Sequence, residues 1–222
     1  MDGIVRSWID GWVVSRGAAP PHAEPWGWTI DSGLAKEVTR HVLGAVGDDV
    51  EEKTVRAVSA SVTGEGVWLK VFRDPARTAG WLDGSWWVDP EPGYLMSAPL
   101  PPCAAPAPPA GYRVRSWTAG GVTRVMLAAG DGSFAARGQI AVTGSGAVAD
   151  QIETSPAHRR RGLGSFVMRA LQHTAAEQGA RTGVLAGTPA GRALYTSLGW
   201  TTRALLTSAR SLGGHEAARP QG

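Results

Sequence analysis

The stretch VADQIETSPAHRRRGLGSFVMRALQHTAAEQGARTGVLAGTPAGRALYTSLGW, residues 148–200, decides the fold of this 222-residue chain. Residues 148–154 have the composition of a strand. Apolar residues then recur at helical spacing from Leu163 onwards, and Gly179 is a typical helix stop. A basic turn, residues 159–164, lies between the two patterns. The stretch therefore predicts a strand, a basic turn and an amphipathic helix, in that order.

The basic turn is suited to bind a phosphate group. The first turn of a helix carries backbone N–H groups without internal partners and the positive end of the helix dipole. Glycines at 162 and 164 leave room for a phosphate to approach, and three neighbouring arginines can donate charge-assisted hydrogen bonds. Neither a Walker loop nor the dinucleotide pattern G-x-G-x-x-G is complete here. We expect a pyrophosphate at this turn; a solvated arginine cluster on a structural helix is the alternative.

The turn resembles the acyl-CoA motif of the GNAT superfamily of N-acetyltransferases, Gln/Arg-x-x-Gly-x-Gly/Ala. Arg159, Gly162 and Gly164 match it, and ALYTSLGW at residues 193–200 resembles the late helix of the superfamily. Two motifs in the right order are more specific than either alone. The resemblance covers about residues 112–205. It implies an α+β fold with a mixed, mostly antiparallel sheet and flanking helices, here preceded by a divergent α+β N-terminal region.

The resemblance implies acetyl-CoA as co-substrate and assigns positions that bind it. Backbone groups of the strand before the turn would hold the pantetheine arm, the turn would hold the pyrophosphate, and Thr188 stands where many relatives have an asparagine. The residues implied for the cofactor are Ile152, Thr154, Arg159, Arg160, Arg161, Gly162, Leu163, Gly164, Ser165 and Thr188.

Catalysis by direct transfer needs an acid for the leaving thiolate and a route for the proton of the amine. Tyr195 matches the usual general acid of the superfamily, and a core tyrosine is the alternative. Asp150 and Glu153 are the candidate bases. Simple strand alternation places Asp150 on the face of Ile152 and Thr154, with Glu153 on the other, unless a β-bulge intervenes. Either acid could instead pair with an arginine, with a water chain as base.

Composition bounds the class of protein. The chain has 43% hydrophobic and 18% charged residues, which is typical of a globular protein. A single cysteine, Cys103, excludes an intrachain disulfide and a cysteine metal cluster, and the five histidines have no ligand spacing, so we expect no metal. No apolar run of about 18 residues and no signal-peptide pattern occurs, which favours a cytoplasmic protein without a membrane partner.

The proline-rich stretch APLPPCAAPAPPAG predicts a linker at residues 98–111. It would join a divergent α+β region, residues 1–97, to a GNAT-like domain, residues 112–212, followed by a flexible tail, residues 213–222. Within the first region, residues 34–43 have the pattern of a helix. Only strands and tight turns are predicted between residue 112 and the cofactor strand, where relatives place helices over the acceptor site. Our hypothesis is that residues 1–97, a divergent half-domain or a degenerate copy, cover that site.

The charge is uneven, with net −5 over residues 1–105 and net +8 over residues 106–222. Eight of the ten tryptophans precede residue 90. Together these features favour a cationic small-molecule amine with an apolar body as acceptor. The sequence thus predicts an N-acetyltransferase acting by direct attack in a ternary complex. A non-catalytic acyl-CoA-binding module and acetylation of a macromolecular amine, on protein or aminoacyl-tRNA, are the alternatives. Nucleic acid is not expected as a partner, and a homodimer stays open.

Overall fold

The structure is a computed structural model that describes residues 2–44 and 50–213. Its strands are β1 (His22–Glu24), β2 (Gly27–Leu34), β3 (Glu37–Leu43), β4 (Val67–Val71), β5 (Trp86–Val88), β6 (Gly93–Pro99), β7 (Tyr112–Ala119), β8 (Val122–Ala129), β9 (Phe134–Thr143), β10 (Gly146–Thr154), β11 (Thr182–Gly187) and β12 (Thr201–Ser211). Its helices are α1 (Asp2–Arg16), α2 (Glu52–Ala60), α3 (Pro75–Thr78), α4 (Leu163–Glu177) and α5 (Pro189–Ser197), with short 3-10 helices at Ala79–Trp81 and Pro156–His158.

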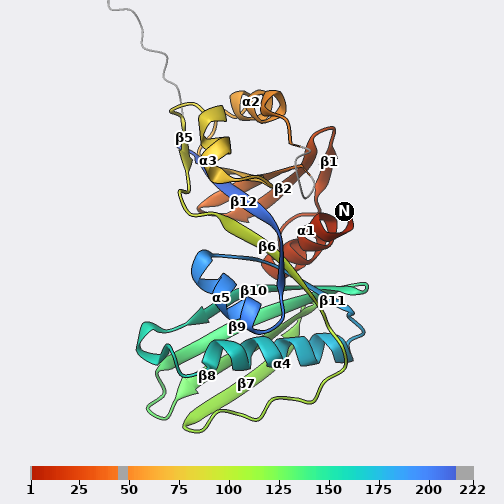
Figure 1. Ribbon diagram of the computed structural model, residues 1–222, viewed down its shortest axis with the longest axis vertical. Helices are drawn as coiled ribbons and strands as arrows, with labels where there is room; N and C mark the ends of the chain where they lie inside the picture. Colours follow the sequence, from red (N-terminus) through yellow and green to blue (C-terminus); the bar gives the residue numbers. More distant parts are fainter. Residues whose placement is uncertain (1, 45–49, 214–222) are drawn as a thin grey trace, which may run out of the picture.

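The described strands form one twelve-stranded sheet in the order β1-β2-β3-β4-β12-β6-β11-β10-β9-β8-β7, with β5 beside β12 (Figure 1). Two pairs, β3 with β4 and β10 with β11, are parallel, and the others are antiparallel. The predicted α+β fold, a mixed and mostly antiparallel sheet with flanking helices, is confirmed. Within the described ranges, no helix is long and apolar enough to span a bilayer.

Helices α1 and α4 cover opposite faces of the same strands. Successive residues of a strand point to opposite faces. Val148 of β10 accordingly packs in the core beneath α1, and the next residue, Ala149, packs in the core beneath α4. In α4, buried side chains recur at the helical spacing that its sequence shows, from Leu163 to Ala175. Figure 1 shows α4 lying across β7–β10 in the lower half of the molecule.

The first ninety-nine residues contribute directly to the sheet that carries the acyl-CoA motif. Strand β6 is hydrogen-bonded between β11 and β12, so the boundary proposed at residue 97 falls inside a central strand. Residues 100–111 contain no helix or strand and run beside α4, where His173 bonds the carbonyl of Cys103 at 2.8 Å. Helix α1 covers the face of β10 that is opposite to α4. No covering helix was predicted between residue 112 and the cofactor strand.

The helix predicted for residues 34–43 is wrong, because this segment forms the end of β2, a turn and β3. Strand β3 is paired on both sides, with β2 and with β4. Its buried residues Arg40, Val42 and Leu43 are placed by those neighbours, and such packing overrides a local helical pattern.

Close contact between α1 and β10 generates a prediction. A Cβ built on Gly11 would lie 2.3 Å from Cγ2 of Val148, a buried side chain of β10. We expect Gly11→Ala to lower the free energy of unfolding by about 1–3 kcal/mol, as overpacking does, despite the better helix propensity of alanine. Gly3→Ala in the same helix meets no atom within 4 Å and serves as the control. Urea unfolding of both variants measures the difference, and equal stabilities would contradict the close approach.

Candidate active site

The site lies where two parallel strands part. Strands β10 and β11 pair over three residues, the last pair being Val148 with Val184, although β10 continues to Thr154 and β11 to Gly187. Beyond that pair, the edge of β10 that faces β11 has no strand partner. Two hollows adjoin there, a groove of about 920 Å³ and a smaller cavity of about 230 Å³. Both are lined by Ala149, Asp150, Ala186, Gly187 and Thr188.

One end of the groove is a turn with free backbone N–H groups. Among the described residues, the N–H groups of residues 160–165 have no hydrogen-bond acceptor. Arg160 has φ 63° and Gly162 has φ 76°, both left-handed. Alternating left- and right-handed residues turn successive N–H groups to one side, which makes an anion-binding nest in front of the dipole of α4. The predicted phosphate turn therefore has the geometry of an anion site.

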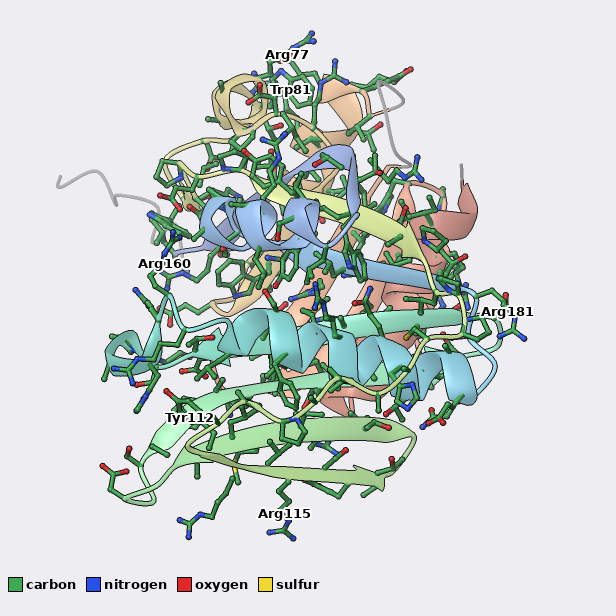
Figure 2. All side chains as sticks on the ribbon, turned by 60° about the horizontal axis from the view of Figure 1, so that its bottom comes forward. Arg77, Trp81, Tyr112, Arg115, Arg160 and Arg181 are labelled. Carbon is green, nitrogen blue, oxygen red and sulfur yellow. The ribbon has the colours of Figure 1, made fainter. Side chains whose placement is uncertain are left out.

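The three arginines of the turn differ in direction. Side chains of Arg159 and Arg160 line the groove, and Figure 2 shows Arg160 at the edge of the molecule beside the start of α4. Arg161 instead donates a 3.3 Å hydrogen bond to the hydroxyl of Tyr112 on β7. The structure thus brings Arg159 and Arg160 to the groove, whereas Arg161 is turned towards β7 and is not among the residues that line it.

The remaining residues of the turn lie close to the strand edge. Leu163 is buried in the core, so only its backbone can serve a ligand, while Ser165 lines the groove. A Cβ on Gly164 would lie 3.0 Å from Leu194 and 3.6 Å from the hydroxyl of Thr154. A glycine at this position therefore allows the start of α4 to lie close to both α5 and β10.

A β-bulge in β10 changes which residues share a face. Asp150 pairs with Gln139, and Glu153 pairs with Arg137, so two residues of β10 stand opposite one of β9. Gln151 has φ 54° within this bulge. Because directly paired residues lie on the same face, Asp150 and Glu153 both face the side of α1.

Simple alternation predicted that Asp150 shares a face with Ile152 and Thr154, and this is wrong. Ile152 packs against the core beneath α4, and Thr154 pairs with Ala136 of that core. The physical reason is the extra residue of the bulge, which shifts the alternation by one position. The bulge therefore turns Ile152 and Thr154 towards the side of α4 and the two carboxylates towards the side of α1, although all four residues line the groove.

Asp150 is the centre of a hydrogen-bonded cluster that joins α1 to β10. Its Oδ2 accepts from Nε of Arg16 and, at 2.9 Å, from the hydroxyl of Ser15; its Oδ1 accepts from Nη2 of Arg16 at 2.9 Å and from the N–H of Gln151 at 2.8 Å. Gln139 donates to the same serine at 2.7 Å. Four donors fill the acceptor sites of the carboxylate.

The two candidate bases therefore differ in surroundings. The side chain of Asp150 is 14% exposed, whereas that of Glu153 is 51% exposed and pairs with Arg137 at 2.8 Å. Burial lowers the pKa of Arg16, but the hydrogen bond and charge of Asp150 outweigh it, so the pKa lies above its ordinary value. The geometry makes Asp150 a fixed ion-pair partner of Arg16 and leaves Glu153 a solvated ion-pair partner of Arg137.

Tyr195 of α5 lies against the end of β11. A Cβ on Gly187 or Gly191 would come within 2.8 or 2.9 Å of its ring, so both glycines are needed for the ring to fit. Its residue is 7% exposed and lines the groove, and its hydroxyl has no hydrogen-bond partner in the described part of the chain. Burial, and then the charge of Asp150, raise the pKa of Tyr195 to about 12, so the phenol is protonated at neutral pH.

Thr188 begins α5 and stands at the wall between the two hollows. Its Oγ1 accepts a 3.2 Å hydrogen bond from the N–H of Gly191, which caps the helix. The hydroxyl proton is not used by that bond and can donate to a ligand. Thr188 therefore has a structural role at the N-cap and keeps one donor for the groove.

The smaller cavity contains residues that sequence reasoning did not single out. Its walls come from α1, β3, β4, β12 and the segment before β6, and they carry Trp8, Trp12, Arg16, Arg40, Lys70, Asp89, Glu91 and Ser208. The tryptophan-rich first half had suggested an apolar pocket wall, but the cations were missed. The available signal was a lysine inside an apolar strand, Lys70 between Leu69 and Val71. Burial, and then the charge of Arg40, lower the pKa of Lys70 to about 7.

Comparisons with known proteins concern the family and the fold of the chain. The model of the Acetyltransferase (GNAT) family matches residues 85–200. Similar solved structures include a GCN5-related N-acetyltransferase from Kribbella flavida, with TM-score 0.63, 18% identity and 97% of both chains covered. A protein assigned to the GNAT family from Novosphingobium aromaticivorans has TM-score 0.55 and 17% identity, covering 93% of this chain and 95% of its own.

A tandem GNAT protein from the clavulanic acid biosynthesis pathway has TM-score 0.50 and 16% identity, over 67% of this chain and 65% of its own. At such identities the likeness concerns the fold. No curated protein matches the chain.

The cluster around Asp150 generates a stability prediction. We expect Arg16→Ala to lower the free energy of unfolding by about 1–3 kcal/mol, because it leaves a mostly buried carboxylate without its counter-ion. Adding Asp150→Asn should recover part of that loss, which a double-mutant cycle measures. Arg137→Ala breaks a half-exposed pair on the same sheet and should cost at most about 1 kcal/mol. Equal losses in the two single variants would contradict a buried clamp between α1 and β10.

Proposed function

Because this chain belongs to the GNAT family of acetyltransferases, we propose that it transfers an acetyl group from acetyl-CoA to a primary amine. One observation carries the proposal: a continuous groove joins the anion-binding turn before α4 to the hydroxyl of Tyr195 and adjoins a second cavity. Such an arrangement offers one site for a phosphate-bearing donor and a separate site for an acceptor, on either side of the parted strands.

The residues of the groove fit an acyl-CoA. Six backbone N–H groups and two guanidinium groups suit the pyrophosphate, and a Cβ on Gly162 would meet no atom within 4 Å, so the space before the turn is open. The unpaired edge of β10 beyond Val148 offers backbone partners for the amides of a pantetheine arm. Thr188 has a donor to spare at the same wall.

Acetyl-CoA supplies an acetyl thioester, and attack by a neutral amine forms the C–N bond and breaks the C–S bond. Tyr195 has the position and protonation state to give its phenolic proton to the departing sulfur. The lone cysteine, Cys103, lines neither hollow, which favours direct transfer between bound donor and acceptor over an acyl-cysteine.

Asp150 is best placed as a positioning residue. A carboxylate whose oxygens already accept four hydrogen bonds has no free lone pair for the proton of the amine. It holds α1 against β10 and, through its charge, helps to keep Tyr195 protonated. We therefore propose that water in the smaller cavity accepts the proton of the amine. Glu153 forms an ion pair with Arg137 and has no role in the proton transfer.

Acetyl-CoA-dependent product formation across an amine panel, read by mass spectrometry, tests the function. The panel holds amino acids, polyamines, aminoglycosides, arylalkylamines and short peptides. An acetylated product would support the enzyme and identify the class of acceptor. Thermal stabilisation by acetyl-CoA without any product would instead favour the acyl-CoA-binding module, or a macromolecular amine.

Tyr195→Phe removes the proposed acid and keeps the ring. We expect kcat to fall about 10²-fold while the Kd for acetyl-CoA changes little, because the ring still packs on Gly187 and Gly191. Steady-state kinetics and calorimetry measure the two quantities. An unchanged kcat would show that Tyr195 is only a core residue.

Arg160→Gly tests the turn, because it should weaken acetyl-CoA binding without lowering the melting temperature. Glycine adopts the left-handed conformation freely, so we expect the melting temperature to stay equal or rise. Loss of the guanidinium should weaken acetyl-CoA binding about fivefold to tenfold. Arg181→Ala, beyond the other end of α4 (Figure 2), is the control and should leave affinity unchanged. Equal affinity in both variants would remove Arg160 from the binding turn.

A further inference from the structure

We propose that the acceptor is an amino-carboxylate, whose acidic group binds Lys70 in the smaller cavity while its amine points to the parted strands. This inference rests on the proposed function and names the chemistry of the acceptor. It depends on four observations about the cavity: an ammonium group without an ionic partner, two cations already neutralised by protein, an aromatic wall, and a separation between the lysine and the reaction centre.

Lys70 has no ionic partner in the described structure. Its Nζ donates a 2.9 Å hydrogen bond to the hydroxyl of Ser208 on β12 and lies 4.6 Å from the centroid of the Trp68 ring. No described carboxylate forms an ion pair with it. A serine hydroxyl and an indole face supply no counter-ion to this half-buried ammonium group, and removing a charge from water without a counter-ion is costly. A ligand carboxylate would supply that counter-ion.

The other two cations of the cavity are paired with carboxylates of the protein. Arg16 pairs with Asp150, and Arg40 pairs with Glu37 and stacks on Trp12 at 3.7 Å. Asp89 accepts the N–H of Glu91, which is exposed. Arg16, Glu37, Arg40 and Asp89 set the field around Lys70, and its lowered pKa of about 7 shows that burial and the arginines outweigh the two acids. The exposed acidic residue before β6 would attract the ammonium end of a zwitterion.

The arrangement gives the acceptor a direction. Its amine must reach the wall shared with the groove, at Asp150 and Gly187, whereas Lys70 bonds to β12. Strand β6 lies between β11 and β12, so these two strands are roughly 10 Å apart on a spacing of about 4.8 Å. The two functional groups are therefore separated by several bonds. Trp8 and Trp12 line the same cavity and offer apolar surface to the body of the acceptor, and a volume of about 230 Å³ favours a small molecule.

Matched amines test the proposal. The full chain is assayed with 6-aminohexanoate against hexylamine and with γ-aminobutyrate against butylamine. Phenylalanine against 2-phenylethylamine is the control pair, because an α-amino acid is too short to reach from Lys70 to the parted strands and should show no preference. We expect the carboxylate member of at least one of the first two pairs to have a kcat/KM at least tenfold higher. Lys70→Met should abolish that preference by raising the KM of the carboxylate at least tenfold, with kcat changed less than threefold. Lys36→Met, at an exposed lysine, is the matched control and should keep the preference.

A pH profile and a melting curve separate this role from others. As Lys70 deprotonates above about pH 7, the KM of the carboxylate relative to its partner amine should rise, and Lys70→Met should flatten that ratio. The variant should also melt at a higher temperature near pH 7, because the unfolded chain binds a proton there that the buried lysine binds weakly. That gain should shrink as pH rises from 7 towards 10.5.

Two outcomes would overturn the proposal. The proposal fails if the wild-type chain has the same kcat/KM for the amines without a carboxylate as for their carboxylate partners. A Lys70→Met variant that loses kcat equally with both members of each pair would make Lys70 a base. If no amine is acetylated, the proposed function fails separately: stabilisation by 6-aminohexanoate in the presence of CoA, lost in Lys70→Met, would still support carboxylate binding, and its absence would refute it.

Discussion

Strands β10 and β11 pair over only three residues, and both the groove and the smaller cavity adjoin the gap beyond Val148 and Val184. If the two strands stayed paired to their ends, β10 would have no free edge and the groove would have no wall. The bulge at Gln151 belongs to the same departure from regular pairing, because it turns Asp150 and Glu153 to the side of α1. Local irregularity in one strand thus separates the side of the groove that faces α4 from the side of the smaller cavity.

The charged side chains around the parted strands have different roles. Asp150 is held by α1 through Arg16 and Ser15, so the helix that covers the acceptor face also fixes the strand that carries the groove. Lys70 and Arg160, unlike Asp150, are expected to lower the stability of the free protein. Lys70 does so because its ammonium group is desolvated, and Arg160 because its backbone is left-handed. Residues that destabilise the free fold and face a hollow are typical of sites where binding is expected.

Local patterns predicted the parts of the site that are local. The turn before α4 and the helix with Tyr195 could be read because each depends on residues a few positions apart. Residues 34–43 could not be assigned correctly, since their strand is defined by pairing with β2 and β4. The ion pair of Arg16 with Asp150 joins positions 134 residues apart, and Lys70 meets Ser208 across 138. A single sequence contains no signal for such contacts.

The position of β12 has a consequence for how the molecule assembles. This strand comes last among the strands of residues 2–44 and 50–213, yet it lies in the middle of the sheet, between β4 and β6. During synthesis, the strands on its two sides exist as separate halves with unpaired edges until it emerges. The wall that holds Ser208 beside Lys70 is complete only then. Closure of the sheet and completion of the smaller cavity therefore depend on the same strand.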